Sequence, residues 1–156
     1  MSKTVVGKGY SVSINVTAEN KGEVTENFYV SAIHGGMIDE LPVTLPPDTS
    51  DVFSIGWNTA NTEMGNYSIS GYSEVVPGET YTSDNLYTRG WVVVTIPGDV
   101  KGDFIVDIFD AILVAGTFNT VPQSVNWNPN TDINCDNTVD IFDAIILAGH
   151  FNMHYP

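Results

Sequence analysis

The sequence predicts a chain of two parts, an all-β sandwich followed by a small α-helical domain made of two loop–helix repeats. Apolar and polar residues alternate through the first half, which is typical of strands with one buried face. The apolar spacing becomes helical in the last third, where residues recur at intervals of three and four. The heptad VDIFDAI occurs twice, at Val106–Ile112 and at Val139–Ile145, which indicates a duplicated unit.

Composition excludes several classes of partner. A chain of 156 residues with 42% hydrophobic residues is long enough and apolar enough to bury a core. Nineteen acidic residues against five basic ones give a net charge of −14, which argues against nucleic acid and anionic membranes because both would be repelled. No apolar run reaches the length of about 18 residues that a membrane helix needs, and the first residues lack the apolar segment of a signal peptide. We therefore expect no membrane insertion.

Residues 1–96 are expected to form the sandwich. The runs YSVSINVTA, NFYVSAI, DVFSIGW and YSISGY alternate in polarity and are rich in β-branched and aromatic residues, and ENKGE, LPPDTS and VPGET separate strands as turns. Six or seven short antiparallel strands, about ten residues apart, are typical of a β-sandwich. We expect Trp57 and Trp91 to lie in or near its core.

Residues 97–156 are expected to form the helical domain, with the boundary at Pro97–Gly98. DIFDAILVAGTF and DIFDAIILAGHF both place Asp where a helix begins and Gly near its end. The Pro- and Asn-rich segment NTVPQSVNWNPNT connects the two helices.

Each predicted helix follows a loop with the spacing of a calcium site. The first loop, Asp99 to Asp110, and the second loop, Asp132 to Asp143, both have Asp at positions 1, 5, 9 and 12. A twelve-residue calcium loop takes side-chain oxygens from positions 1, 3, 5, 9 and 12 and a backbone carbonyl from position 7. An acidic turn with helix-capping residues is the simpler alternative. The predicted ligands are Asp99, Asp103, the Ile105 carbonyl, Asp107 and Asp110 in the first loop, and Asp132, Asn134, Asp136, the Thr138 carbonyl, Asp140 and Asp143 in the second.

The two loops are not equivalent. Position 6 prefers a residue that tolerates a left-handed backbone, and the second loop has Asn137 there. The first loop has Phe104 at position 6 and Lys101 at position 3, where a charged lysine has no lone pair to offer. We expect two Ca²⁺ sites, of which the first is weaker. The single cysteine, Cys135, excludes an intramolecular disulfide and falls at position 4, which supplies no ligand.

The stretch GDVKGDFIVDIFDAILVAGTF … DINCDNTVDIFDAIILAGHF resembles the duplicated, EF-hand-like repeat of type I dockerins, over about Pro97 to Asn152. The resemblance implies a noncatalytic adaptor that folds around two Ca²⁺ ions and docks onto a cohesin module through either repeat. It implies recognition at loop positions 10 and 11 and further along each helix. The corresponding residues are Ile108, Phe109, Ile141 and Phe142, with Ala115, Gly116, Ala148 and Gly149 downstream. Dockerins often carry small hydroxyl residues at positions 10 and 11, so the apolar pair here indicates a hydrophobic contact surface or packing within the chain.

The first half resembles the CARDB-type sandwich, a relative of the immunoglobulin fold, in YSVSINVTAENKGE, VTLPPDTSDVFSIGW, GNYSISGYSEVVPGET and DNLYTRGWVVVTIPGDV. This resemblance implies an extracellular location, at the C-terminal end of an archaeal surface protein. A strand that usually precedes TVVGKGY in such a sandwich is missing, which predicts an open edge able to accept a strand from a neighbouring chain. The triplets at Asn15 and Asn66 are compatible with N-glycosylation.

Two functions are compatible with these features. The first is a non-catalytic calcium-binding adhesion or docking module of an extracellular surface protein, with a cohesin-like partner. The alternative is a calcium-stabilised structural subunit that assembles with neighbouring copies of itself into a surface layer or filament. We expect no enzyme, because the sequence has no Gly-rich phosphate loop, no G-x-S-x-G and no HExxH motif.

Overall fold

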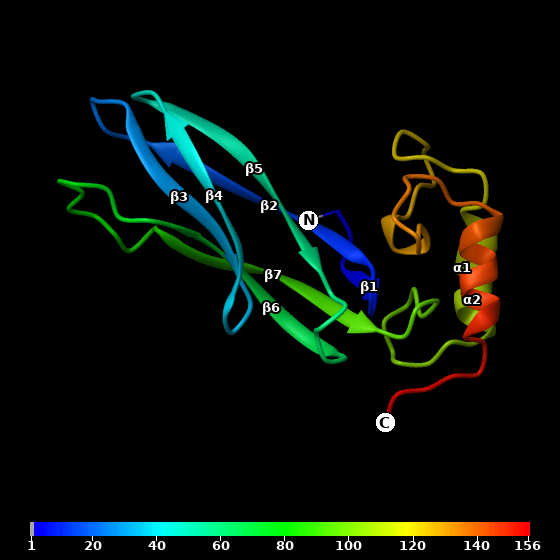
Figure 1. The fold of residues 1–156 in the computed structure, drawn as a ribbon. Helices are drawn as coiled ribbons and strands as arrows, with labels where there is room; N and C mark the ends of the chain where they lie inside the picture. Colours follow the sequence, from blue (N-terminus) through cyan, green and yellow to red (C-terminus); the bar gives the residue numbers. More distant parts are fainter. Residues whose placement is uncertain (1) are drawn as a thin grey trace. The chain divides into compact units, whose positions relative to one another are not determined.

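The computed structural model describes residues 2–156, and strands make up most of their regular structure (Figure 1). The strands are β1 Val5–Gly7, β2 Ser11–Asn20, β3 Glu26–Ile33, β4 Met37–Leu45, β5 Thr49–Asn58, β6 Gly65–Ser73 and β7 Leu86–Thr95. The helices are α1 Ile108–Gly116 and α2 Ile141–Gly149, with a 3₁₀ turn at Pro129–Thr131 between them. Within the described residues, neither helix has the length and apolar character needed to cross a bilayer.

The strands form two sheets, one of order β1-β7-β6-β3-β4 and one of order β2-β5. Seven strands among residues 2–156 confirm the predicted number. Strand β3 pairs antiparallel with both β4 and β6, as expected for a sandwich. The expectation of a purely antiparallel arrangement is wrong at one edge, because β1 runs parallel to β7, with Val5 opposite Val93. A parallel partner must reach this edge by a long connection, and period-two alternation carries no information on direction.

The chain separates into two compact units. The sandwich unit contains residues Ser13–Trp57 and Ser68–Trp91, and the loop–helix unit contains Ser2–Val12, Asn58–Tyr67 and Val92–Pro156. These units alternate along the sequence, whereas the predicted domains, 1–96 and 97–156, meet at a single boundary. That boundary stays a prediction about which segments fold independently.

Alternation along the strands builds the core of the sandwich unit. Its buried apolar residues are Ile14, Ala18, Phe28, Val30, Ala32, Val43, Leu45, Ile55, Trp57 and Ile69. The two sheets approach closely at Gly71, where an added Cβ would lie 2.7 Å from Cγ1 of Val16. Trp57 is buried as predicted and stacks on His34, with 4.4 Å between the ring centroids. The prediction for Trp91 is wrong: it is 54% exposed, because it faces outward on β7 beside the buried Val92.

The core of the loop–helix unit is built from the sequence repeat. Its buried apolar residues are Ile96, Val100, Val106, Val114, Ile133, Val139 and Leu147. Apart from Ile96, these residues form three pairs that are 33 positions apart, so each repeat contributes equivalent side chains to one shared core. The two helices lie side by side (Figure 1). Neither repeat alone could bury this set, because each provides only half of the apolar surface.

Gly98, directly before the first loop, tests whether the chain packs closely against this core. Its φ is +101°, and an added Cβ would lie 2.9 Å from the Cα of Leu147. We predict that Gly98→Ala lowers the free energy of unfolding by about 1–3 kcal/mol, because both the backbone conformation and the space exclude a side chain. Urea denaturation measures this change.

Gly116→Ala is the matched control, since nothing lies within 4 Å of an added Cβ at this helix end. It should leave stability unchanged or raise it slightly. Equal stability of the Gly98→Ala variant and the wild type would contradict the close packing at Gly98.

Candidate metal centre

The repeated aspartates at loop positions 9 and 12 form the N-terminal caps of the helices. Asp107 caps α1 by accepting the backbone N–H of Phe109 at 2.8 Å. Asp110 at the third helical position accepts the backbone N–H of Asp107 at 2.9 Å and completes a capping box. Asp140 and Asp143 make the same box at α2. Each cap is worth about 1 kcal/mol, so the helix-capping alternative accounts for part of the repeated pattern.

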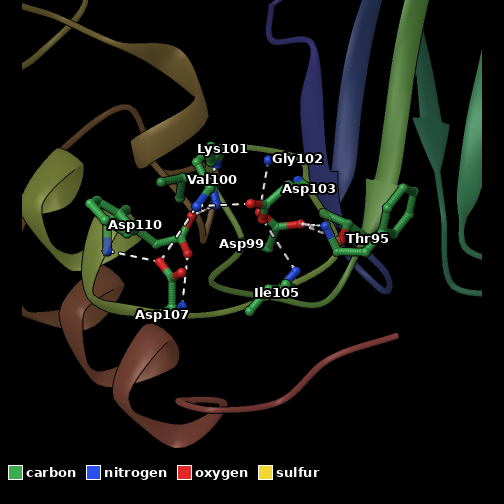
Figure 2. Close-up of polar contacts among 11 residues, drawn as sticks. Thr95, Asp99, Val100, Lys101, Gly102, Asp103, Ile105, Asp107 and Asp110 are labelled. Carbon is green, nitrogen blue, oxygen red and sulfur yellow. Dashed lines mark hydrogen bonds and ion pairs between the residues drawn. The ribbon is translucent and has the colours of Figure 1, made fainter. Parts of the chain in front are cut away.

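Asp99, at position 1 of the first loop, is 2% exposed and closes the loop around its own carboxylate. Figure 2 shows it at the centre of the loop's polar contacts. One oxygen accepts the backbone N–H groups of Gly102 at 2.7 Å and Asp103 at 3.3 Å. The other accepts the N–H of Phe104 at 2.8 Å and the hydroxyl of Thr95 at 2.6 Å. These four bonds engage about all four lone-pair sites of the carboxylate, so a cation would have to displace at least one of them.

Asp110 holds the opposite side of the first loop (Figure 2). It is fully buried and accepts the backbone N–H groups of Val100 at 3.0 Å and Lys101 at 3.1 Å in addition to its capping bond. Burial raises the pKa of Asp110, and the negative charge of Asp99 acts in the same direction. The backbone N–H groups oppose this rise. The first loop therefore stabilises two buried carboxylates mainly with its own backbone dipoles.

Lys101 supplies the first loop with a cation of its own. Its Nζ lies 2.8 Å from a carboxylate oxygen of Asp103 and 3.5 Å from one of Asp107, two of the predicted ligands. The hydrogen bond to Asp103 raises the pKa of Lys101, so the side chain stays protonated at neutral pH. The same ammonium lies 5.0 Å from the ring centroid of Phe109. A positive charge at this place opposes the binding of a metal ion, so the first loop is the poorer candidate for Ca²⁺.

The second loop repeats the backbone network with more acceptor capacity left over. Asp143 is fully buried and accepts the N–H groups of Ile133 at 2.6 Å and Asn134 at 3.2 Å. Asp132 is 4% exposed, and within residues 2–156 its carboxylate accepts the N–H groups of Asp136 at 3.1 Å and Asn137 at 3.0 Å and no others. Asp132 therefore keeps two of its four lone-pair sites, unlike Asp99 in the first loop.

The charges of the second loop are poorly compensated. Among residues 2–156, no ion pair involves Asp132, Asp136, Asp140 or Asp143. Burial raises the pKa of Asp132, which the nearby positive charge of Lys3 partly opposes. The ammonium of Lys3 itself bonds to the backbone carbonyl of Asp132 and lies 3.3 Å from Sγ of Cys135.

The donor set of the second loop fits a hard divalent cation in its chemistry. It has four carboxylates and the side-chain oxygen of Asn134, and Ca²⁺ prefers oxygen ligands of these kinds. In the structure, Asn134 donates to the carboxylate of Asp136 at 2.8 Å. Within residues 2–156, no three His, Cys, Asp or Glu side chains converge closely enough to hold a metal as they stand. The side chains at positions 3 and 5 would therefore have to turn from each other toward the ion.

The two loops share the same backbone conformation although their side chains differ. Position 6 is left-handed in both, with φ of +68° at Asn137 and +67° at Phe104. Asn tolerates this conformation as predicted, whereas a bulky Phe costs about 1–2 kcal/mol there. Position 4 is left-handed too, at Gly102 and at Cys135, so Cys135 stands where the first loop uses glycine.

Backbone hydrogen bonds connect the two repeats. Val106 exchanges N–H and C=O bonds with Met153 and Asn152, which follow α2, at 2.9 and 2.8 Å. Val139 makes the equivalent bonds to Thr120 and Asn119, which follow α1, at 3.0 and 2.8 Å. Each loop is thus tied to the chain leaving the other helix. Gly116 and Gly149 are the last residues of the helices, as the prediction of Gly near each helix end expected, and the left-handed residues beyond them are Asn119 and Asn152.

The predicted partner-binding residues point into solvent. Ile108 and Phe109 are 56% and 59% exposed, and their equivalents Ile141 and Phe142 are 55% and 59% exposed. The alternative that they pack within the chain is wrong. Ile112 and Ile145 are both 58% exposed and were not among the predicted residues. Each lies four residues, about one helical turn, after the residue at loop position 10, and this i+4 spacing could have identified them. We call Ile108, Phe109 and Ile112 the first helix patch, and Ile141, Phe142 and Ile145 the second helix patch.

The two predicted glycosylation sites are accessible. Asn15 on β2 and Asn66 on β6 both have exposed side chains. Modification itself stays a prediction.

No family model matches this chain, and no curated protein matches it. Among solved structures, it is similar to the CARDB domain of a Pyrococcus furiosus protein in complex with di-metal ions, at 23% identity and a TM-score of 0.48, over 60% of this chain and 86% of that one. A domain assigned to a cell surface protein of Methanosarcina acetivorans matches at 22% identity and a TM-score of 0.46, over 58% and 82%. A mutant type II cohesin–X–dockerin complex from Acetivibrio cellulolyticus matches at 14% identity and a TM-score of 0.33, over 94% and 97%. At these TM-scores the neighbours carry no argument about what the chain binds.

Lys101 offers a test of the difference between the loops. We predict that Lys101→Asn, which places a carboxamide oxygen at position 3 as in the second loop, creates an additional calcium-binding event or tightens a weak one by about tenfold. Calorimetric titration of the metal-free chain with Ca²⁺ measures this change.

Lys8→Asn is the matched control for Lys101→Asn. It removes the same charge from a lysine of similar exposure whose ion-pair partner, Glu63 at 4.0 Å, lies outside both loops. Identical titrations for the two variants would contradict a specific role of Lys101.

Proposed function

We propose that this protein is a non-catalytic, calcium-stabilised docking module of the cell surface, with its main calcium site in the second loop. The observation that carries the proposal is that the second repeat combines an acidic loop with an exposed apolar helix surface. Four carboxylates without an ion-pair partner among the described residues lead directly into a helix that exposes the second helix patch. When bound, calcium would neutralise the crowded carboxylates.

The loop and the patch are mechanically coupled. Asp140 and Asp143 belong both to the loop and to the first turn of α2, and Ile141 and Phe142 lie between them. Any ligand that orders the loop therefore fixes the direction of these two apolar side chains. Because the ordered site exists only in the folded chain, binding free energy adds to stability.

The exposed apolar residues support a protein partner. Large apolar side chains in contiguous surface groups are unusual on monomers and mark interaction sites, and aromatic residues often dominate binding energy there. Both helix patches carry the same three side-chain types at nearly equal exposure. The dockerin resemblance of the sequence supports a cohesin-like partner that uses either patch.

The proposal includes no catalytic step. The carboxyl groups with raised pKa values, Asp110 and Asp132, both accept backbone N–H groups inside the loops and are buried. Neither is presented to a substrate.

The calcium part of the proposal is tested by two matched substitutions at position 5. Asp136→Ala should lower the calcium affinity at least about tenfold, because it removes a ligand from the second loop, whereas Asp103→Ala in the first loop should change it less than about twofold. Calorimetric titration of each metal-free variant gives the affinities. No heat of binding at millimolar Ca²⁺, or equal effects of the two substitutions, would contradict the proposed site.

The docking part is tested with cohesin domains immobilised on a sensor surface in the presence of Ca²⁺. Because the two helix patches are equivalent, Phe109→Ala or Phe142→Ala alone should weaken binding only a few-fold, and the double variant should abolish it. Removal of calcium by a chelator should also abolish binding.

Light scattering of the chain alone separates this proposal from the alternative of self-assembly. A monomer with and without Ca²⁺ is expected. Calcium-triggered growth into large particles, without any second protein, would favour a structural subunit of a layer or filament.

A further inference from the structure

A long groove runs along one flank of the sandwich unit. Its volume is about 930 Å³. One wall is the segment from Ile14 to Gly22, which includes most of β2. The other contains residues 71–74 and 76–81 and Tyr87, Arg89 and Gly90 of β7. No residue of the two aspartate loops lines it, so its function does not depend on the function proposed for them.

Free strand edges line both walls of the groove. Strand β2 pairs only with β5, so alternate N–H and C=O groups along it face away from its sheet. On β7, the partner β1 covers only Val93–Thr95, which leaves the preceding residues of the strand without a neighbour on that side. Free edges of this kind are templates for an added strand, because the backbone groups are already aligned.

The groove combines an apolar floor with an acidic rim. Ile14, Phe28 and Ile69 contribute buried apolar surface to its lining. The charged lining residues are Glu19, Glu26, Glu74, Glu79 and Asp84 against Lys21 and Arg89. Lys21 is already engaged with Asp84 at 3.3 Å and Glu19 at 3.7 Å, so the rim retains an excess of negative charge. Exposed Tyr81 and Tyr87 offer aromatic faces, which attract cationic side chains.

We propose that this groove accepts an extended, basic segment of a partner protein as an added strand beside β2. Alternate side chains of such a segment would face the apolar floor, and the basic ones would meet the acidic rim. A second copy of this chain is a poor occupant, because its net charge of −14 adds repulsion to the rim. A neutral oligosaccharide could stack on the tyrosines but would leave the row of backbone groups without matched partners.

The test uses the full isotope-labelled chain and a capped peptide of alternating lysine and valine, about nine residues long, a common strand length. Amide hydrogen exchange should slow at least about tenfold at alternate residues from Asn15 to Asn20 when the peptide saturates the chain. A peptide with glutamate in place of lysine should bind at least about tenfold more weakly.

Glu26→Lys in the groove should weaken binding of the lysine peptide about fivefold, because it converts a rim carboxylate to a cation. Glu40→Lys makes the same charge change at an exposed position of β4 outside the groove and should have no effect. The proposal is overturned if the peptide leaves the β2 amides unprotected, if both peptides bind equally, or if cellohexaose and not the peptide perturbs these residues.

Discussion

Burial of four aspartates is the constraint on which the loop–helix unit depends. Asp99, Asp110, Asp132 and Asp143 stand at the first and last positions of the two loops, and none is more than 4% exposed. A buried carboxylate is tolerable only when its oxygens are bonded, and here backbone N–H groups of the same loop supply those bonds. The bonds force each loop to curl around its own acids, which begins each helix at a fixed residue. Among the described residues, no buried side-chain polar atom lacks a hydrogen-bond partner.

The two repeats satisfy this constraint by different means at position 3. In the first loop, the ammonium of Lys101 forms ion pairs with the carboxylates of Asp103 and Asp107. The carboxylate of Asp99 accepts hydrogen bonds from backbone N–H groups and a hydroxyl. In the second loop, Asn134 brings no charge, and Asp132 accepts fewer bonds. The first loop therefore sets one lysine against its four aspartates, whereas the second loop has four aspartates and no basic residue of its own. The residue at position 3 is thus one place where the two otherwise repeated loops differ in charge.

The surface of the molecule offers two unlike kinds of contact. The helix patches are apolar, compact and repeated, which suits side-chain packing against a preformed partner. The groove beside β2 is elongated, acidic at its rim and lined by free backbone groups, which suits an extended segment. The two contacts belong to different compact units and differ in chemistry.

The sequence by itself determined the features that local chemistry controls. The period-two runs, the capping aspartates and the 33-residue repeat located the strands, the helix starts and the equivalent loops, because alternation and capping act within a few residues. Only the tertiary structure decided what depends on distant partners, such as the parallel pairing of β1 with β7 and the outward position of Trp91. The same holds for Lys3, which bonds to the backbone carbonyl of Asp132 in the second loop, 129 residues away in the sequence. No spacing rule reaches across such a separation, since the contact exists only after both segments have joined one core.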